Sequence, residues 1–185
     1  MRIAVAALLG AIVMFVWQFM AHMVLPIGLM GFRMPQNEDI VLQSVATGLP
    51  TSGIYLLPSM DPAKMSDEAV VKAWTEKASK NPMVFAVVSP PSQEGMSMTP
   101  QLVKQFITNL IGAFLIAFVL AATAWTLGMR IVGSTVFGVF GWLLNIVPQW
   151  NWYRFPADFM VGNLLEQGIG WLLAGVAMAW WLGRR

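Results

Sequence analysis

Apolar residues along the chain gather in four long runs, and one long polar stretch separates the first run from the second. Each run approaches the roughly 20 residues that a helix needs to cross a bilayer. The pattern therefore predicts four membrane-spanning helices. We expect the first within residues 1–24 and the other three within 101–185, at about 104–129, 131–148 and 157–183.

The first apolar run could belong either to a cleaved signal peptide or to a retained anchor. The apolar part of a signal peptide is about 7–15 residues long and precedes a small-residue cleavage site. Here the run extends from Ile3 to about Met23 and ends in FMAHMV. The length and the ending favour a retained membrane anchor.

Proline and aromatic residues mark the expected ends of the later spans. Thr99 is expected to cap the second span, and Pro148 is expected to end the third. The segment VPQWNWYRFP at 147–156 then becomes a short hairpin at the outer membrane surface, where aromatic side chains favour the headgroup layer. We interpret its polar and aromatic side chains as interfacial anchors, with a binding lid as the alternative. They are Trp150, Trp152, Tyr153 and Arg154.

Positive charge at one set of helix ends predicts the orientation. If all four runs span, then Arg2, Arg130, Arg184 and Arg185 fall on the same side. Short loops rich in arginine and lysine are typical of the cytoplasmic side. We therefore expect a multi-pass protein of the bacterial inner membrane with both termini in the cytoplasm.

Residues 25–100 are expected to form a small α+β segment outside the cytoplasm. A first helix should be capped by Asn37 and end at Gly48, and a second should be capped by Ser66. The runs GIYLLP and MVFAVVSP are rich in strand-forming residues, and residues 89–98 should lead back to the membrane. The apolar side of the second helix is predicted to consist of Val70, Val71, Trp74 and Ala78.

Composition supports a membrane location and excludes several kinds of site. The chain is 57% hydrophobic and 11% charged, whereas soluble domains average roughly 45–50% and about 25%. A net charge of +2 without a basic stripe argues against nucleic-acid binding. The chain has no cysteine and a single histidine, His22, which excludes thiolate and multi-histidine metal centres within one chain. The fold class is thus an all-α integral membrane bundle with a small α+β insertion between its first two helices.

Four short motifs carry a resemblance to a known group of proteins. They are Trp17, HMVLP at 22–26, IYLLP at 54–58 and WNWYRFP at 150–156. In these motifs the chain resembles a group of bacterial inner-membrane proteins. The resemblance implies a location and no chemistry.

Polar side chains occur near the same end of all four expected spans. Because the directions of the spans alternate, these residues should all lie at the depth of the outer leaflet. These residues, which we call the polar layer, are Gln18, His22, Gln105, Asn109, Asn145, Asn163 and Glu166. One interpretation is that they hydrogen-bond between helices and fix their register. The other is an outward-facing cavity that binds a lipid headgroup, a quinone or a small solute, with Glu166 and His22 as its titratable members.

Chemical motifs do not identify a reaction. The chain contains no phosphate-binding loop, no HExxH and no GxSxG, so no catalytic residue, metal ligand or cofactor is assigned. Glu166 and His22 could still relay protons in a membrane enzyme of unrecognised type. Met20 and Met23 beside His22 raise periplasmic copper handling as a further alternative, because thioethers suit Cu(I).

These observations together favour a non-catalytic accessory, assembly or scaffold subunit. The expected partners are the lipid bilayer and other membrane or periplasmic proteins. A homo-oligomer is an open alternative. The main alternative is a binding or transport protein that uses the outward polar cavity. Copper handling and an unrecognised enzyme form the second alternative.

Overall fold

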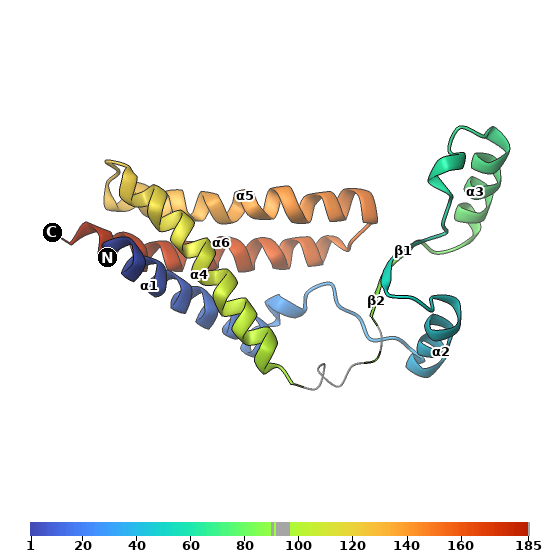
Figure 1. The fold of residues 1–185 in the computed structure, drawn as a ribbon, viewed down its shortest axis with the longest axis horizontal. Helices are drawn as coiled ribbons and strands as arrows, with labels where there is room; N and C mark the ends of the chain where they lie inside the picture. Colours follow the sequence, from blue (N-terminus) through green and yellow to red (C-terminus); the bar gives the residue numbers. More distant parts are fainter. Residues whose placement is uncertain (90, 92–96, 185) are drawn as a thin grey trace. The chain divides into compact units, whose positions relative to one another are not determined.

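The computed structural model describes residues 1–89, 91 and 97–184. The chain forms two compact units, which are described separately (Figure 1). A helical unit comprises Met1–Arg33 and Ser97–Arg185, and a small unit comprises Met34–Met96. Most of the return segment expected at 89–98 lies outside the described residues.

The helical unit contains four helices that are long and apolar enough to cross a membrane. Four such helices were predicted from the apolar runs, and this part of the prediction is confirmed. The first continues into a short π-helical turn, η1 (Met20–Val24), and then a 3₁₀ turn, η2 (Pro26–Leu29). The four helices are α1 (Arg2–Phe19), α4 (Thr99–Ala122), α5 (Leu127–Tyr153) and α6 (Ala157–Gly183).

Helices α1 and α6 occupy the two central positions among the four. Helix α1 packs against both α4 and α6, and α5 packs along α6, antiparallel to it (Figure 1). The shared core of α1, α4 and α6 consists mainly of small residues and methionine, including the fully buried Ala11, Met14, Ala117 and Met178. Small side chains let helix backbones approach closely, which is how helices associate where lipid surrounds them.

The α5–α6 contact depends on a glycine. A Cβ atom on Gly138 would lie 2.8 Å from the carbonyl oxygen of Gln167 and 2.5 Å from Cδ1 of Trp171. Next to this contact, the buried hydroxyl of Ser134 donates a hydrogen bond to the carbonyl oxygen of Trp171 at 2.8 Å. The two backbones can therefore approach this closely only because residue 138 has no side chain.

The expected boundaries of the second and third spans are wrong. Helix α5 passes through Pro148 and ends only after Tyr153, because Arg154 adopts a left-handed conformation (φ 57°). The backbone N–H of Phe155 then bonds back to the carbonyl oxygen of Gln149, which closes the helix end. The second span lies at Thr99–Ala122 instead of 104–129, and Thr99 is its first helical residue instead of its cap.

The chain after α1 folds back against the start of α6. The 3₁₀ turn η2 contacts α6, and Gly31 (φ 89°) lies so close to Phe159 that a Cβ atom would meet its backbone at 2.8 Å. Arg33 forms an ion pair with Asp158 in the first turn of α6. These contacts fix the position of the π turn that carries His22.

The small unit contains two helices and a two-stranded antiparallel sheet, as the sequence predicts. Strands β1 (Gly53–Leu57) and β2 (Val84–Val88) pair with Ile54 opposite Val87. The other elements are α2 (Glu38–Gly48), η3 (Pro62–Lys64) and α3 (Glu68–Lys80).

Local signals in the small unit are confirmed with one exception. Asn37 caps α2 by accepting a hydrogen bond from the N–H of Ile40, and α2 ends at Gly48. The cap of α3 is Asp67 and not Ser66, because the Asp67 carboxylate accepts hydrogen bonds from two backbone N–H groups. The predicted apolar side of α3 is its less exposed side, and Trp74 donates a hydrogen bond to the carbonyl oxygen of Pro58 at 2.9 Å.

Candidate functional site

The central feature of the candidate site is a histidine–glutamate pair that joins α1 to α6. His22 Nε2 lies 3.2 Å from Glu166 Oε2. His22 lies within the π turn η1, and such turns are frequent at functional sites because one extra residue per turn shifts the side chains that follow. The turn is stabilised by a hydrogen bond from the N–H of Leu25 to the carbonyl oxygen of Met20.

The two members of the pair differ in their access to the surroundings. The Glu166 side chain is 11% exposed, whereas the His22 side chain is 48% exposed. The carboxylate is therefore shielded, and the imidazole connects it to the exterior. This arrangement can exchange a proton or hold a small cation at the carboxylate.

A tryptophan that the sequence analysis did not place in the site supports this pair. Trp17 Nε1 donates a hydrogen bond to the backbone carbonyl of Glu166 at 2.9 Å. A tryptophan in an apolar helix needs a partner for its N–H, so the sequence signals the need but not the acceptor. Gly28 also supports the site, because a Cβ atom there would meet the His22 ring at 2.3 Å.

A second polar cluster joins α1 to α4. Asn109 Nδ2 donates to Gln18 Oε1 at 2.7 Å, and Gln105 Nε2 donates to Asn109 Oδ1 at 3.0 Å. Asn109 is buried and Gln105 is exposed, so this chain of amides leads from the helix contact to the surface. Gln18 and His22 thus face different neighbours, and α1 carries both clusters.

The other two polar side chains expected in the layer are not joined to it. Asn145 Nδ2 donates to the carbonyl oxygen of Gly141 on its own helix, and Asn145 is exposed. Asn163 Nδ2 likewise donates to the carbonyl oxygen of Phe159. A side chain that bonds to the carbonyl four residues earlier needs no neighbouring helix. The structure therefore joins Gln18 to Asn109 and His22 to Glu166, and it leaves Asn145 of α5 and Asn163 of α6 outside both clusters.

The aromatic segment after Val147 has a different form from the expected hairpin. Trp150, Trp152 and Tyr153 belong to the last turns of α5, and only the residues from Arg154 to Pro156 connect α5 to α6. Trp152 is 71% exposed, so its indole is available to surroundings outside the protein. An exposed aromatic cluster at a helix end fits an interfacial anchor better than a lid over a cavity.

The methionines near His22 in the sequence lie in different surroundings. Met23 is largely exposed, and Met30 packs against Gly162 of α6. Across the described residues, no three His, Cys, Asp or Glu side chains lie close enough together to hold a metal ion.

Comparisons with protein-family models, curated proteins and solved structures give no match. The geometry of the chain itself therefore has to carry the functional argument.

Proposed function

We propose that the protein is a non-catalytic accessory or scaffold subunit of a bacterial inner-membrane assembly. In this proposal the four long helices form a bundle that spans the bilayer four times, with both termini in the cytoplasm. The small unit then lies outside the cytoplasm and contacts a partner protein. Four helices of sufficient length and apolarity support the membrane placement, and the arginines at one set of helix ends support the orientation.

The small unit provides the observation that carries the proposal. Of its described residues only Pro58 is buried, although the unit contains two helices and two strands. One face of its sheet carries the cross-strand pair Ile54 and Val87, each 71% exposed, with Leu56 beside them. A two-stranded sheet needs a further surface to cover such a face before it is stable. A unit built in this way is suited to docking.

The polar layer supports the same proposal. Asn109 and Gln18 are hydrogen-bonded between α4 and α1, and Glu166 is paired with His22 between α6 and the end of α1. Interhelical hydrogen bonds of this kind contribute roughly 1 kcal/mol or less each and define register. The layer therefore has an adequate structural explanation in the positioning of α1 between α4 and α6.

Site-specific photo-crosslinking in the intact membrane tests the accessory role. A crosslinking amino acid at Ile54 should form a stoichiometric adduct with one other protein. The same amino acid at Lys72, which is exposed on α3, should not. Ile54→Asp should also abolish co-purification of that protein in mild detergent, and Lys72→Asp should preserve it. An adduct formed only within the chain would contradict the proposal, because the sheet face would then dock on the protein's own helices.

A second candidate function is favoured by the exposed imidazole next to a shielded carboxylate. In this alternative His22 and Glu166 form a proton-exchange or small-cation site that opens outward. Complementation of a deletion strain separates the two functions. Glu166→Gln should retain activity for an accessory subunit and abolish it for a proton or cation site. Glu68→Gln is the control, because it removes a carboxylate from an exposed position in α3, outside the polar layer and its supporting contacts.

A further inference from the structure

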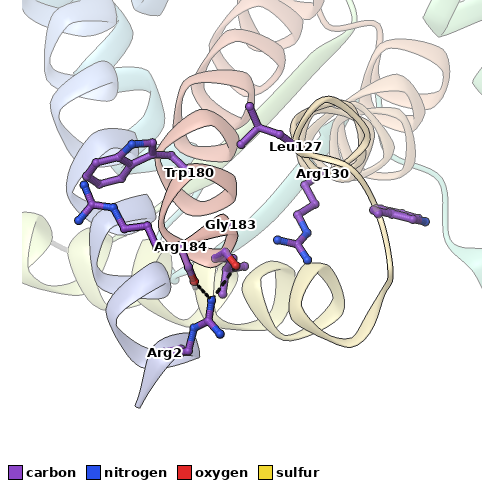
Figure 2. A pocket seen from close by; sticks show the side chains of 8 residues that line it. Arg2, Leu127, Arg130, Trp180, Gly183 and Arg184 are labelled. Atoms are coloured by element: carbon purple, nitrogen blue, oxygen red, sulfur yellow. Dashed lines mark hydrogen bonds between the residues drawn. The ribbon is translucent and has the colours of Figure 1, made fainter.

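A basic pocket lies at the opposite end of the helical unit from the His22–Glu166 pair. It has a volume of about 580 Å³ and is formed where α1 begins, α5 begins and α6 ends. Figure 2 shows Arg2 of α1 and Arg130 of α5 pointing into the space beside Gly183. The other lining residues are Trp125, Leu127, Trp180, Leu182 and Arg184.

Positive charge in this pocket is not balanced by an acidic side chain of the described helical unit. Arg2, Arg130 and Arg184 all line it. Within the described residues of the helical unit the only acidic residues are Asp158 and Glu166, which lie in the first three turns of α6, whereas the pocket adjoins its last turn. No ion pair between a carboxylate and these three arginines occurs among the described residues. The pocket therefore favours an anion.

The hydrogen-bond donors in the pocket are only partly used. One nitrogen of Arg2 donates to the backbone carbonyls of Leu182 (2.9 Å) and Arg184 at the end of α6. The Arg184 guanidinium stacks on the Trp180 ring at 3.5 Å. Arg130 Nε is buried and has no hydrogen-bond partner among the described residues. A buried donor without an acceptor is unfavourable, so the Arg130 side chain is arranged for an acceptor that none of the described residues supplies.

We propose that this pocket binds a phosphate group, and that the group belongs to the headgroup of an anionic phospholipid. Guanidinium groups match phosphate oxygens in geometry, and the positive end of the α5 dipole adds to the attraction. The rim is apolar, with Trp180 51% exposed and Leu127 54% exposed, and provides a surface for acyl chains. Basic pockets between membrane helices on the cytoplasmic side are typical phospholipid sites.

The claim that the phosphate belongs to a lipid rests on the proposed membrane placement. The claim that the pocket binds a phosphate group does not depend on that placement. The test uses the full chain in nanodiscs of phosphatidylcholine that contain a graded fraction of phosphatidylglycerol. Native mass spectrometry then counts the lipids retained when the protein is released. The wild type should retain phosphatidylglycerol in preference to phosphatidylcholine. Arg130→Gln should weaken this preference about fivefold, which corresponds to the loss of one basic side chain near the headgroups.

Two further variants separate geometry from net charge. Lys104→Gln removes the same charge from an exposed position in α4 and should leave the preference within about twofold of the wild type. Arg130→Lys keeps the charge but lacks the planar fork, so it should retain only part of the preference. Retention in the Arg130→Gln variant equal to that in the Lys104→Gln control would overturn the proposal.

A parallel experiment distinguishes a lipid from a soluble phosphate compound. Calorimetric titration of the protein in neutral detergent with inorganic phosphate and pyrophosphate should give no binding that depends on Arg130. Saturable, Arg130-dependent binding of either ion, without phosphatidylglycerol retention, would overturn the lipid assignment and retain the phosphate site. Because neither readout involves a partner protein, failure here is distinguishable from failure of the accessory role.

Discussion

Replacement of Gly138 by alanine should destabilise the protein, whereas the same change at Gly141 should not. Both residues lie inside α5, so both changes gain the same helix propensity, up to about 1 kcal/mol. A Cβ atom at 138 would meet the Gln167 carbonyl oxygen at 2.8 Å and Trp171 Cδ1 at 2.5 Å. At position 141 the new atom would meet nothing within 4 Å.

The difference between the two variants isolates the packing term. Because a backbone oxygen cannot rotate away, α5 and α6 must separate by several tenths of an ångström to accept Gly138→Ala. Overpacking of this kind costs about 1–3 kcal/mol. The separation also stretches the hydrogen bond from Ser134 to the Trp171 carbonyl, which is worth about 1 kcal/mol. We therefore expect Gly138→Ala to be less stable than Gly141→Ala by about 2–3 kcal/mol.

Unfolding in mixed micelles measures this difference. The detergent-solubilised protein is titrated with sodium dodecyl sulfate and followed by tryptophan fluorescence, to which Trp171 in the contact contributes. Gly138→Ala should unfold at a clearly lower denaturant fraction than Gly141→Ala. Equal midpoints for the two variants would refute the close approach of α5 and α6 at this position.

Three further predictions concern the polar layer, the small unit and the orientation. Glu166→Gln should leave the unfolding midpoint close to that of the wild type. Glu166→Leu should lower the free energy of unfolding by at most about 1.5 kcal/mol, because the half-exposed His22 can bond to water instead. A loss above about 3 kcal/mol in the same titration would contradict this. Residues 35–98 expressed alone should show no cooperative thermal transition, since only Pro58 is buried among their described residues, and a dispersed amide spectrum would argue otherwise. A single cysteine placed at Ser79 or Asn151 should react with an impermeant thiol reagent in spheroplasts, and one placed at Gly183 should not. The chain has no native cysteine that could react instead. The opposite labelling pattern would reverse the orientation.

Features determined by short-range periodicity could be predicted from the sequence. Helix α3 illustrates this, because spacing of three and four residues placed Val70, Val71, Trp74 and Ala78 on one side, and these are its less exposed residues. The Asn37 cap likewise depends on residues adjacent in the chain. In each case the physical cause lies within about one turn of the residue concerned.

The end of α5 could not be predicted in this way, because proline has more than one outcome in a helix. Pro148 lacks an N–H and usually ends a helix, and on that basis the span was expected to stop there. In apolar helices the freed carbonyl can be satisfied by local adjustment, so the helix continues. Helix α5 actually ends where Arg154 adopts a left-handed backbone, and an arginine side chain does not predict that conformation.

A helical wheel also could not predict which polar side chains contact one another. The wheel correctly placed His22 and Glu166 on faces that meet, because α1 and α6 pack directly against each other. It placed Asn145 in the same layer, although α5 packs on α6 and Asn145 bonds to its own helix. A wheel shows which side of a helix is polar, but it does not show which helix lies opposite.

The central position of α1 has a consequence for how the chain is made. If the helices span the membrane as proposed, α1 is synthesised first, and α4 is complete only about 100 residues later. At roughly 5–20 residues per second, α1 stays without α4 for about 5–20 s, and without α6 for longer. Gln18 and His22 have none of their final partners during that interval. On that placement, biogenesis includes a stage in which the helix that packs between α4 and α6 is held with its polar side chains unpaired, and that stage is where an insertion factor has most to recognise.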